Sequence, residues 1–220
     1  MTPPRTVIAD QQIANPATPP TLWDPVVRMT HWGIAVAVVA NALLTEGGSL
    51  THVTVGWLAM AFFLLRLVWG GLGPKEARFS AFPPNPAAAV VHLRRLFKRE
   101  RPREYPSHNP AGALMVYAFW ITLAAVIATG LVITDGATPM QVAADKAAVA
   151  SGDWAALVRK DSGGEDSALK EAAEEVHEVA ANLLLILAAL HVAGVFVETR
   201  VMRRNLVAPM LLGPRTTRRK

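Results

Sequence analysis

Six histidines are the side chains of this 220-residue sequence best suited to bind a metal, because the sequence contains no cysteine. The lack of cysteine excludes disulfides, thiolate-bound zinc, iron–sulfur clusters, a cysteine nucleophile and covalent attachment of a c-type haem. Four of the histidines lie inside or at the edge of apolar segments, namely His31, His52, His177 and His191. Ionisable side chains in such segments are rare and indicate functional sites.

The spacing of these four histidines predicts two pairs at two depths. His177 and His191 are fourteen residues apart, so in a helix they share one face and lie about 21 Å apart along the axis. If neighbouring helices are antiparallel, His52 lies at the same depth in the membrane as His177, and we call these two the outer pair. His31 falls in the same cytoplasmic half as His191, and we call these two the inner pair. The match in depth is looser for the inner pair, because His31 lies nearer the membrane boundary.

Each pair offers two imidazoles from facing helices, which suits a noncovalent haem b (heme b) with two axial histidines. Small residues near the ligands would leave flat space for a porphyrin: Ala35, Gly56, Ala181 and Ala188. A zinc or copper site would need three or four ligands at one depth. Two alternatives remain open: histidines hydrogen-bonded between helices, and a proton or substrate relay in a transporter.

Four apolar stretches must position these histidines, and each is long enough for a membrane-spanning helix of about 20 residues. They cover residues 26–45, 53–72, 111–133 and 176–197. The composition, 52% hydrophobic and 18% charged, also argues against a water-exposed globule. We therefore predict an all-α fold, an integral membrane four-helix bundle with two b haems in its core.

The basic residues predict the orientation of the four spans. Seventeen Lys and Arg residues flank the spans on one side and four on the other, which places both termini in the cytoplasm. We expect a mobile cytoplasmic tail over residues 1–22, which do not form a secretory signal, a transmembrane domain over 23–213 and a basic cytoplasmic tail over 214–220. The net charge of +5 is attributed to topology and lipid headgroups, not to nucleic acid.

Several motifs together resemble the bacterial di-haem cytochrome b-561 family, which includes the cytochrome b subunit of nickel-iron hydrogenase and free-standing relatives. They are WDPVVRMTHW from Trp23, HVTVG from His52, RLVW from Arg66, SHNPAGALMV from Ser107, and the segments beginning at His177 and His191. The resemblance covers about residues 23–213. It implies a four-helix bundle with two b haems, and it places the ligands at the four paired histidines.

The resemblance also implies electron transfer in a respiratory chain of the bacterial inner (plasma) membrane. A periplasmic redox protein, such as a c-type cytochrome or hydrogenase, would exchange electrons at the outer pair, and membrane quinone at the inner pair. One alternative is an enzyme that oxidises superoxide or another small substrate and reduces quinone. Another is a haem-free transporter or anchor.

Two arginines are candidates for contacting the inner haem. Arg66 lies fourteen residues after His52, so it faces the same way one haem depth lower and could pair with a propionate. The alternative is a snorkelling interfacial arginine near Trp69. The propionate hypothesis also applies to Arg28.

The loops between the spans contain further candidate sites. His108, just before the third span, could contact a propionate or a quinone, or Asn109 and Pro110 could simply start the helix. His92 in the same loop is expected to be solvated. Residues 140–158 of the outer loop are expected to form a short amphipathic helix, and the acidic loop around it is either a docking surface for a basic redox protein or a solvated cap.

Overall fold

The computed structural model describes residues 24–98, 100, 105, 107–153, 166–203 and 205–212. The predicted tails over 1–22 and 214–220 lie outside these residues. Within them the chain is helical, with turns between the helices and no strand. The all-α membrane bundle predicted from the sequence is confirmed.

Four helices are long and apolar enough, within the described part of the chain, to cross a membrane. They are α1 (Pro25–Leu43), α2 (Leu50–Leu72), α4 (Pro110–Ile133) and α7 (Asp166–Met202). Their outward faces carry large apolar side chains that are exposed, among them Val36, Leu58, Ile121, Val179 and Ile186. Such faces are expected to contact lipid, because lipid tails solvate them as well as a protein core does.

Local capping explains where the spans begin. The Asp24 carboxylate accepts a hydrogen bond from the backbone N–H of Val26 at 2.8 Å, directly before Pro25 at the first helical position. The Asn109 side chain accepts from the N–H of Gly112 at 2.7 Å, again with a proline next in sequence. Proline is favoured there because the first N–H groups of a helix have no intrahelical partner. Asn109 and Pro110 therefore do start a helix, as one of the two sequence interpretations proposed.

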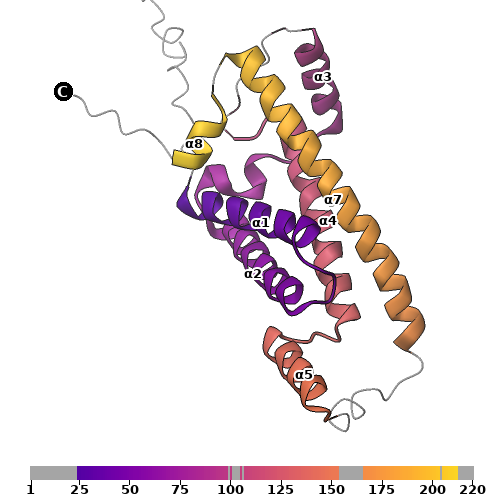
Figure 1. Cartoon of the computed structure of the whole chain (residues 1–220). Helices are drawn as coiled ribbons and strands as arrows, with labels where there is room; N and C mark the ends of the chain where they lie inside the picture. The colour runs from indigo at the N-terminus through magenta and orange to yellow at the C-terminus, as the bar shows by residue number, and fades with distance from the viewer. Residues whose placement is uncertain are drawn as a thin grey trace, which may run out of the picture.

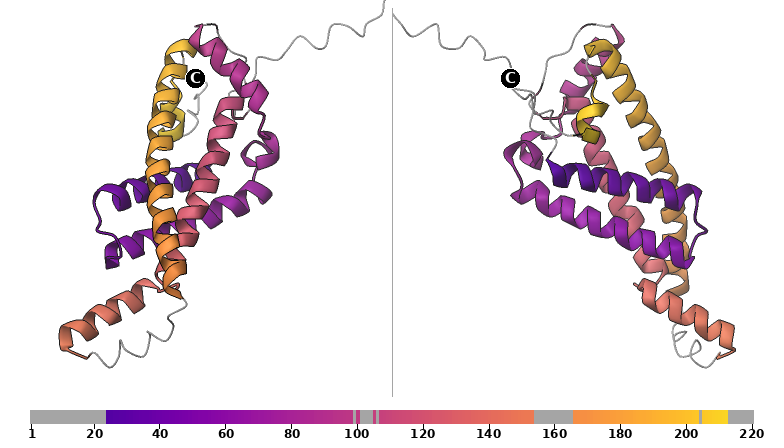
Figure 2. Two further views of the ribbon diagram at one scale, coloured as in Figure 1. Left: turned by 90° about the vertical axis from the view of Figure 1, so that its right-hand side faces the viewer. Right: turned by 60° about the vertical axis from the view of Figure 1, so that its left-hand side comes forward.

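The four spans form two hairpins. Helix α1 packs along α2 and α4 packs along α7, and the α1–α2 hairpin lies across the α4–α7 pair (Figures 1 and 2). Phe63 of α2, Leu123 of α4 and Leu184 of α7 form a buried cluster between the hairpins. Ile34 of α1 and Trp120 of α4 pack against this cluster. The core is small, because most of the apolar surface of the spans faces outward.

Polar contacts join α4 and α7 at both ends of their hairpin. At one end, the Asn109 amide before α4 donates to the Glu198 carboxylate of α7 at 2.8 and 3.0 Å. At the opposite end, Lys170 of α7 forms a 2.6 Å ion pair with Asp135 after α4. Helices α4 and α7 are therefore antiparallel, as consecutive membrane spans must be.

Helix α8 (Val207–Leu212) returns to the start of α1. The Trp32 indole N–H donates to the carbonyl of Met210 at 3.1 Å, and the Arg28 guanidinium donates to the carbonyl of Leu211 at 3.4 Å. The beginning of α1 and the described C-terminal residues thus lie at the same end of the bundle, the end that also holds the start of α4.

The loops differ from the sequence expectations in three places. The connection between the second and third spans contains a helix, α3 (Pro86–Phe97). The Asn85 side chain caps it by accepting a hydrogen bond from the backbone N–H of Ala88 at 2.9 Å. Helix α5 (Pro139–Ser151) ends at Gly152, whose φ of 75° is left-handed, so it is shorter than expected, and residues 154–158 lie outside the described part. Helix α7 begins ten residues before the predicted span. Its first turns are rich in Ala and Glu, which favour helix, but the charged side chains keep them from reading as an apolar span.

Candidate functional site

The outer pair brings together the first turns of α2 and the outer half of α7. The ring centroids of His52 and His177 lie 6.3 Å apart, with the ring planes inclined at 56°. His52 is placed there by its position at the start of α2, where the Ser49 hydroxyl accepts from its backbone N–H at 3.1 Å. The Asn41 amide of α1 donates to the His52 carbonyl at 3.1 Å, so the end of α1 also holds this turn.

The inner pair brings together α1 and the second half of α7. The ring centroids of His31 and His191 lie 6.1 Å apart, and the planes are inclined at 55°. Aromatic rings contact both members edge-on: Trp32 lies 5.2 Å from His31 and Phe119 of α4 lies 5.8 Å from His191. The inner rings are as close as the outer rings, although the sequence suggested a looser match in depth.

Both separations agree with the geometry of two imidazoles that share one metal ion. A metal–imidazole bond is about 2 Å long and the ring centre lies about 1 Å beyond the nitrogen, so two rings on opposite sides of one ion have centres about 6 Å apart. The structure describes all four histidines, and in neither pair does a hydrogen bond join the two rings. Among the described residues, no group of three or more His, Asp or Glu side chains gathers around a common point.

Threonine hydroxyls contact both rings of the outer pair. Thr45 Oγ1 lies 3.1 Å from His52 Nδ1, and Thr129 Oγ1 of α4 lies 3.0 Å from His177 Nδ1. Neither threonine was predicted from the sequence. No spacing rule points to them, because Thr45 reaches His52 across a turn and Thr129 lies on the neighbouring helix α4, 48 residues before His177.

Arg66 is buried, with 6% of its surface exposed, so the alternative of an arginine snorkelling to the surface does not fit its position. Its Nη2 donates to the carbonyl of Ala77 at 3.0 Å, and the guanidinium lies over the ring of Phe79 at 5.2 Å. Its Nη1 is buried and has no hydrogen-bond partner among the described residues. A buried cation of this kind calls for an anionic partner.

His108 lies close to Arg66 and to the inner pair. Burial lowers the pKa of His108 to about 4, and the positive charge of Arg66 and the two inner histidines act in the same direction. Its ring lies 4.4 Å from that of Phe82, and its Nδ1 lies 3.2 Å from the Ser107 hydroxyl. His108 is therefore a neutral imidazole at pH 7 beside the inner pair.

Arg28 lies near the same end of the bundle, one turn before His31. Besides its contact with the carbonyl of Leu211 at 3.4 Å, it has a buried Nε without a partner in the part of the chain that is described. The structure thus brings the two candidate arginines and His108 to the end of the bundle that holds the inner pair.

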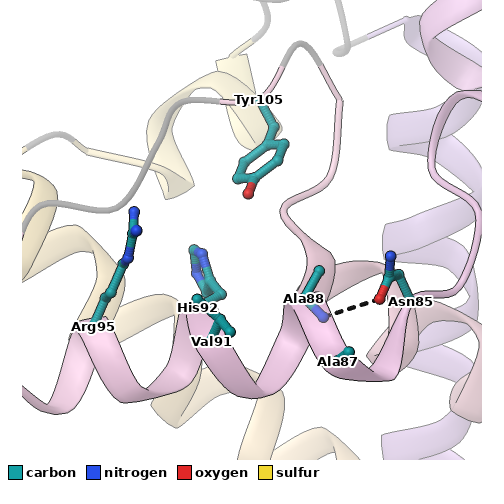
Figure 3. A pocket seen from close by; sticks show the side chains of 7 residues that line it. All are labelled: Asn85, Ala87, Ala88, Val91, His92, Arg95 and Tyr105. Atoms are coloured by element: carbon teal, nitrogen blue, oxygen red, sulfur yellow. Dashed lines mark hydrogen bonds between the residues drawn. The ribbon is translucent and has the colours of Figure 1, made fainter.

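His92 is not the solvated loop residue expected from the sequence. It lies in α3 with 3% of its surface exposed, because α3 packs against α4 and α7. Burial, and then the charge of Arg95, lower the pKa of His92. Figure 3 shows His92 and Arg95 on α3 with Tyr105 across from them, around a hollow that runs along α3 from Asn85 to Arg95.

Comparison with known families gives one match. A family model described as prokaryotic cytochrome b561 matches residues 22–213, which include all four spans and both histidine pairs. Neither a curated protein nor a solved structure matches the chain.

Proposed function

Because the chain belongs to the prokaryotic cytochrome b561 family, we propose that it carries electrons between a redox protein on the periplasmic side of the bacterial inner membrane and membrane quinone. Membership of the family makes it a multi-pass membrane protein of electron transport that binds haem b. The number of haems, the respiratory role, the quinone and the outer redox protein belong to the proposal.

The outer and inner pairs would hold one haem b each, with His52 and His177 as ligands of one and His31 and His191 as ligands of the other. The centroid separations of 6.3 and 6.1 Å carry this proposal, because both equal the spacing of two imidazoles on one metal ion. Haem b supplies one-electron oxidation and reduction at its iron. The protein's part is to ligate the iron, exclude water and set the separation of the two sites.

The inner end of the bundle has the residues needed to bind anionic and carbonyl groups. Arg66, with an unpaired buried nitrogen, would bind a haem propionate, and Arg28 would do the same from α1. His108, neutral at pH 7, would donate or accept a hydrogen bond with a quinone oxygen or a propionate. Since this end also carries the basic segments, it is the cytoplasmic end.

Reoxidation by quinone tests the proposed function. The full chain is reconstituted in phospholipid vesicles, reduced with a stoichiometric amount of dithionite, and mixed anaerobically with a short-chain quinone. We expect the reduced haem bands to disappear on mixing. His108→Gln should slow this reoxidation at least tenfold, while Arg94→Gln, which changes an exposed basic residue of α3, should leave it unchanged. If ferricyanide oxidises the bands and quinone does not, the quinone assignment is wrong.

A further inference from the structure

We propose that Thr45 and Thr129 are positioning residues that fix the tautomer and orientation of the outer histidines, and that the inner pair lacks this support. This inference rests on the proposed ligation of haem by the two pairs. It adds that the two sites are built differently: only the outer site depends on threonine hydroxyls, one from the turn after α1 and one from α4.

The hydrogen bonds of Thr129 determine which way its contact with His177 runs. Its hydroxyl lies 2.7 Å from the carbonyl oxygen of Ala125 and 3.2 Å from that of Val126. A carbonyl can only accept, so the single hydroxyl proton points to these oxygens. The oxygen of Thr129 is then an acceptor for His177 Nδ1 at 3.0 Å, and that nitrogen must carry the proton.

Thr45 repeats this arrangement on His52. Its hydroxyl lies 3.2 Å from the backbone carbonyl oxygen of Asn41 and 3.2 Å from the Asn41 side-chain oxygen, so it donates its proton there. Its oxygen accepts from His52 Nδ1 at 3.1 Å. The orientation of the Asn41 amide is fixed independently, because its nitrogen donates to the His52 carbonyl at 3.1 Å.

Both outer rings are thereby held with a proton on Nδ1, which leaves Nε2 with a free lone pair for a metal. Partners of this kind orient a ligand and raise its basicity, and their loss costs about 10-fold to 100-fold in metal affinity. A more basic imidazole favours the oxidised, more highly charged iron. The threonines should therefore lower the reduction potential of the outer haem.

Gly130, next to Thr129, allows α4 to approach the ring of His177. A Cβ at this position would lie 3.3 Å from Cε1 of His177, which is closer than most such contacts, and 3.7 Å from Nδ1, which is an ordinary contact distance. The glycine and the threonine thus both lie against the imidazole of His177. The short approach keeps the hydroxyl within hydrogen-bond distance of the ring.

The inner pair has no equivalent support on His31. His31 Nδ1 is buried and has no hydrogen-bond partner among the described residues. The neighbours of the inner rings are aromatic, Trp32 and Phe119. Replacing the threonines should therefore change only one of two haem signals.

The test compares Thr45→Val and Thr129→Val with Thr45→Ser and Thr129→Ser, which keep the hydroxyl. Thr54→Val and Thr134→Val are matched controls, because their hydroxyls bond backbone carbonyls at 2.7 and 2.8 Å and contact no histidine. Haem content, redox titration followed by optical spectra, and the low-spin ferric electron paramagnetic resonance signals are measured on the purified full chain.

We expect each valine variant to raise the potential of one haem component, or to lose that haem, while the other component keeps its potential and resonance signal. A tenfold smaller preference for the ferric state corresponds to a rise of about 59 mV. The serine variants and the controls should match the original chain.

Unchanged potentials and signals in both valine variants, or equal changes in both components, would overturn the inference. Absence of haem from the original chain would instead overturn the proposed function. Thr45 lies in the turn after α1 and Thr129 lies in α4, so if one variant fails to fold, the other remains as the test.

Discussion

At the scale of single residues, the two histidines of α7 belong to separate pairs, so each can be removed alone. His191→Ala should abolish the inner haem and leave the outer one, while His52→Ala should do the reverse, because each haem would be held only by the two rings of its own pair, which lie 6.1 and 6.3 Å apart. Haem content per chain and optical spectra of the reduced variants check this. Loss of both haems from a folded His191→Ala variant, or of neither, would contradict the pairing.

His92 gives a pH dependence of stability that does not involve the paired histidines. Burial lowers its pKa in the folded state below the ordinary value of 6.5, so the unfolded chain binds a proton more readily. The contribution of His92 to the free energy of unfolding is therefore fully present above pH 6.5. It is lost as the pH drops below 6.5, by at most about 1.4 kcal/mol per pH unit. Thermal unfolding of the original chain and His92→Gln between pH 7.5 and 5 measures this. A variant as acid-sensitive as the original chain would contradict it.

The residues that could be predicted from the sequence are those with a strong periodic signal. Histidines fourteen residues apart in an apolar segment specify one helix face at two depths, and both predicted pairs lie side by side in the structure. Thr129 could not be predicted, because a threonine in an apolar helix usually bonds its own backbone. Thr45 could not be predicted either, because it lies in the turn after α1, where no periodic spacing points to His52. Only the approach of α4 to α7 shows that Thr129 also contacts His177.

At the scale of helices, the contact between α1 and α2 depends on Gly33. A Cβ at this position would lie 2.6 Å from Cε2 of Phe62, so Gly33→Ala should push the two helices apart. We expect the free energy of unfolding to fall by about 1 to 3 kcal/mol, the usual cost of overpacking a core. Thermal unfolding in detergent, followed by circular dichroism, measures the effect.

Gly194→Ala in α7 is the matched control. Nothing lies within 4 Å of the added methyl group there. In a helix interior, alanine is more favourable than glycine by about 1 kcal/mol. This variant should therefore be as stable as the original chain or more so. If Gly33→Ala were equally stable, the close packing of α1 on Phe62 would not limit stability.

The four spans followed from hydropathy because the bilayer demands long apolar helices, whereas α3 and the first turns of α7 did not. Helix α3 is twelve residues long and mixes alanine and valine with Arg94 and Arg95, so it has neither the length nor the composition of a span. Its position depends on packing against α4 and α7, and burial of His92 follows from that packing alone.

At the scale of the whole molecule, the structure places the start of α1, the start of α4 and α8 at one end. We propose that this end faces the cytoplasm, because most of the basic residues of the sequence flank the spans on this side. A reporter active only in the periplasm should therefore be inactive when fused after Lys220 and active when inserted between Gly47 and Gly48 in the turn after α1. The opposite result would reverse the assignment of the inner pair to the cytoplasmic side.

The central claim is that the chain holds two b haems, one between the rings of each histidine pair. Its most direct measurement is the haem content of the purified full chain, from extraction and from reduced-minus-oxidised spectra. The account predicts two noncovalent b haems per chain, each low-spin with two histidine ligands. A single haem per fully loaded chain, or a colourless folded protein, would contradict it.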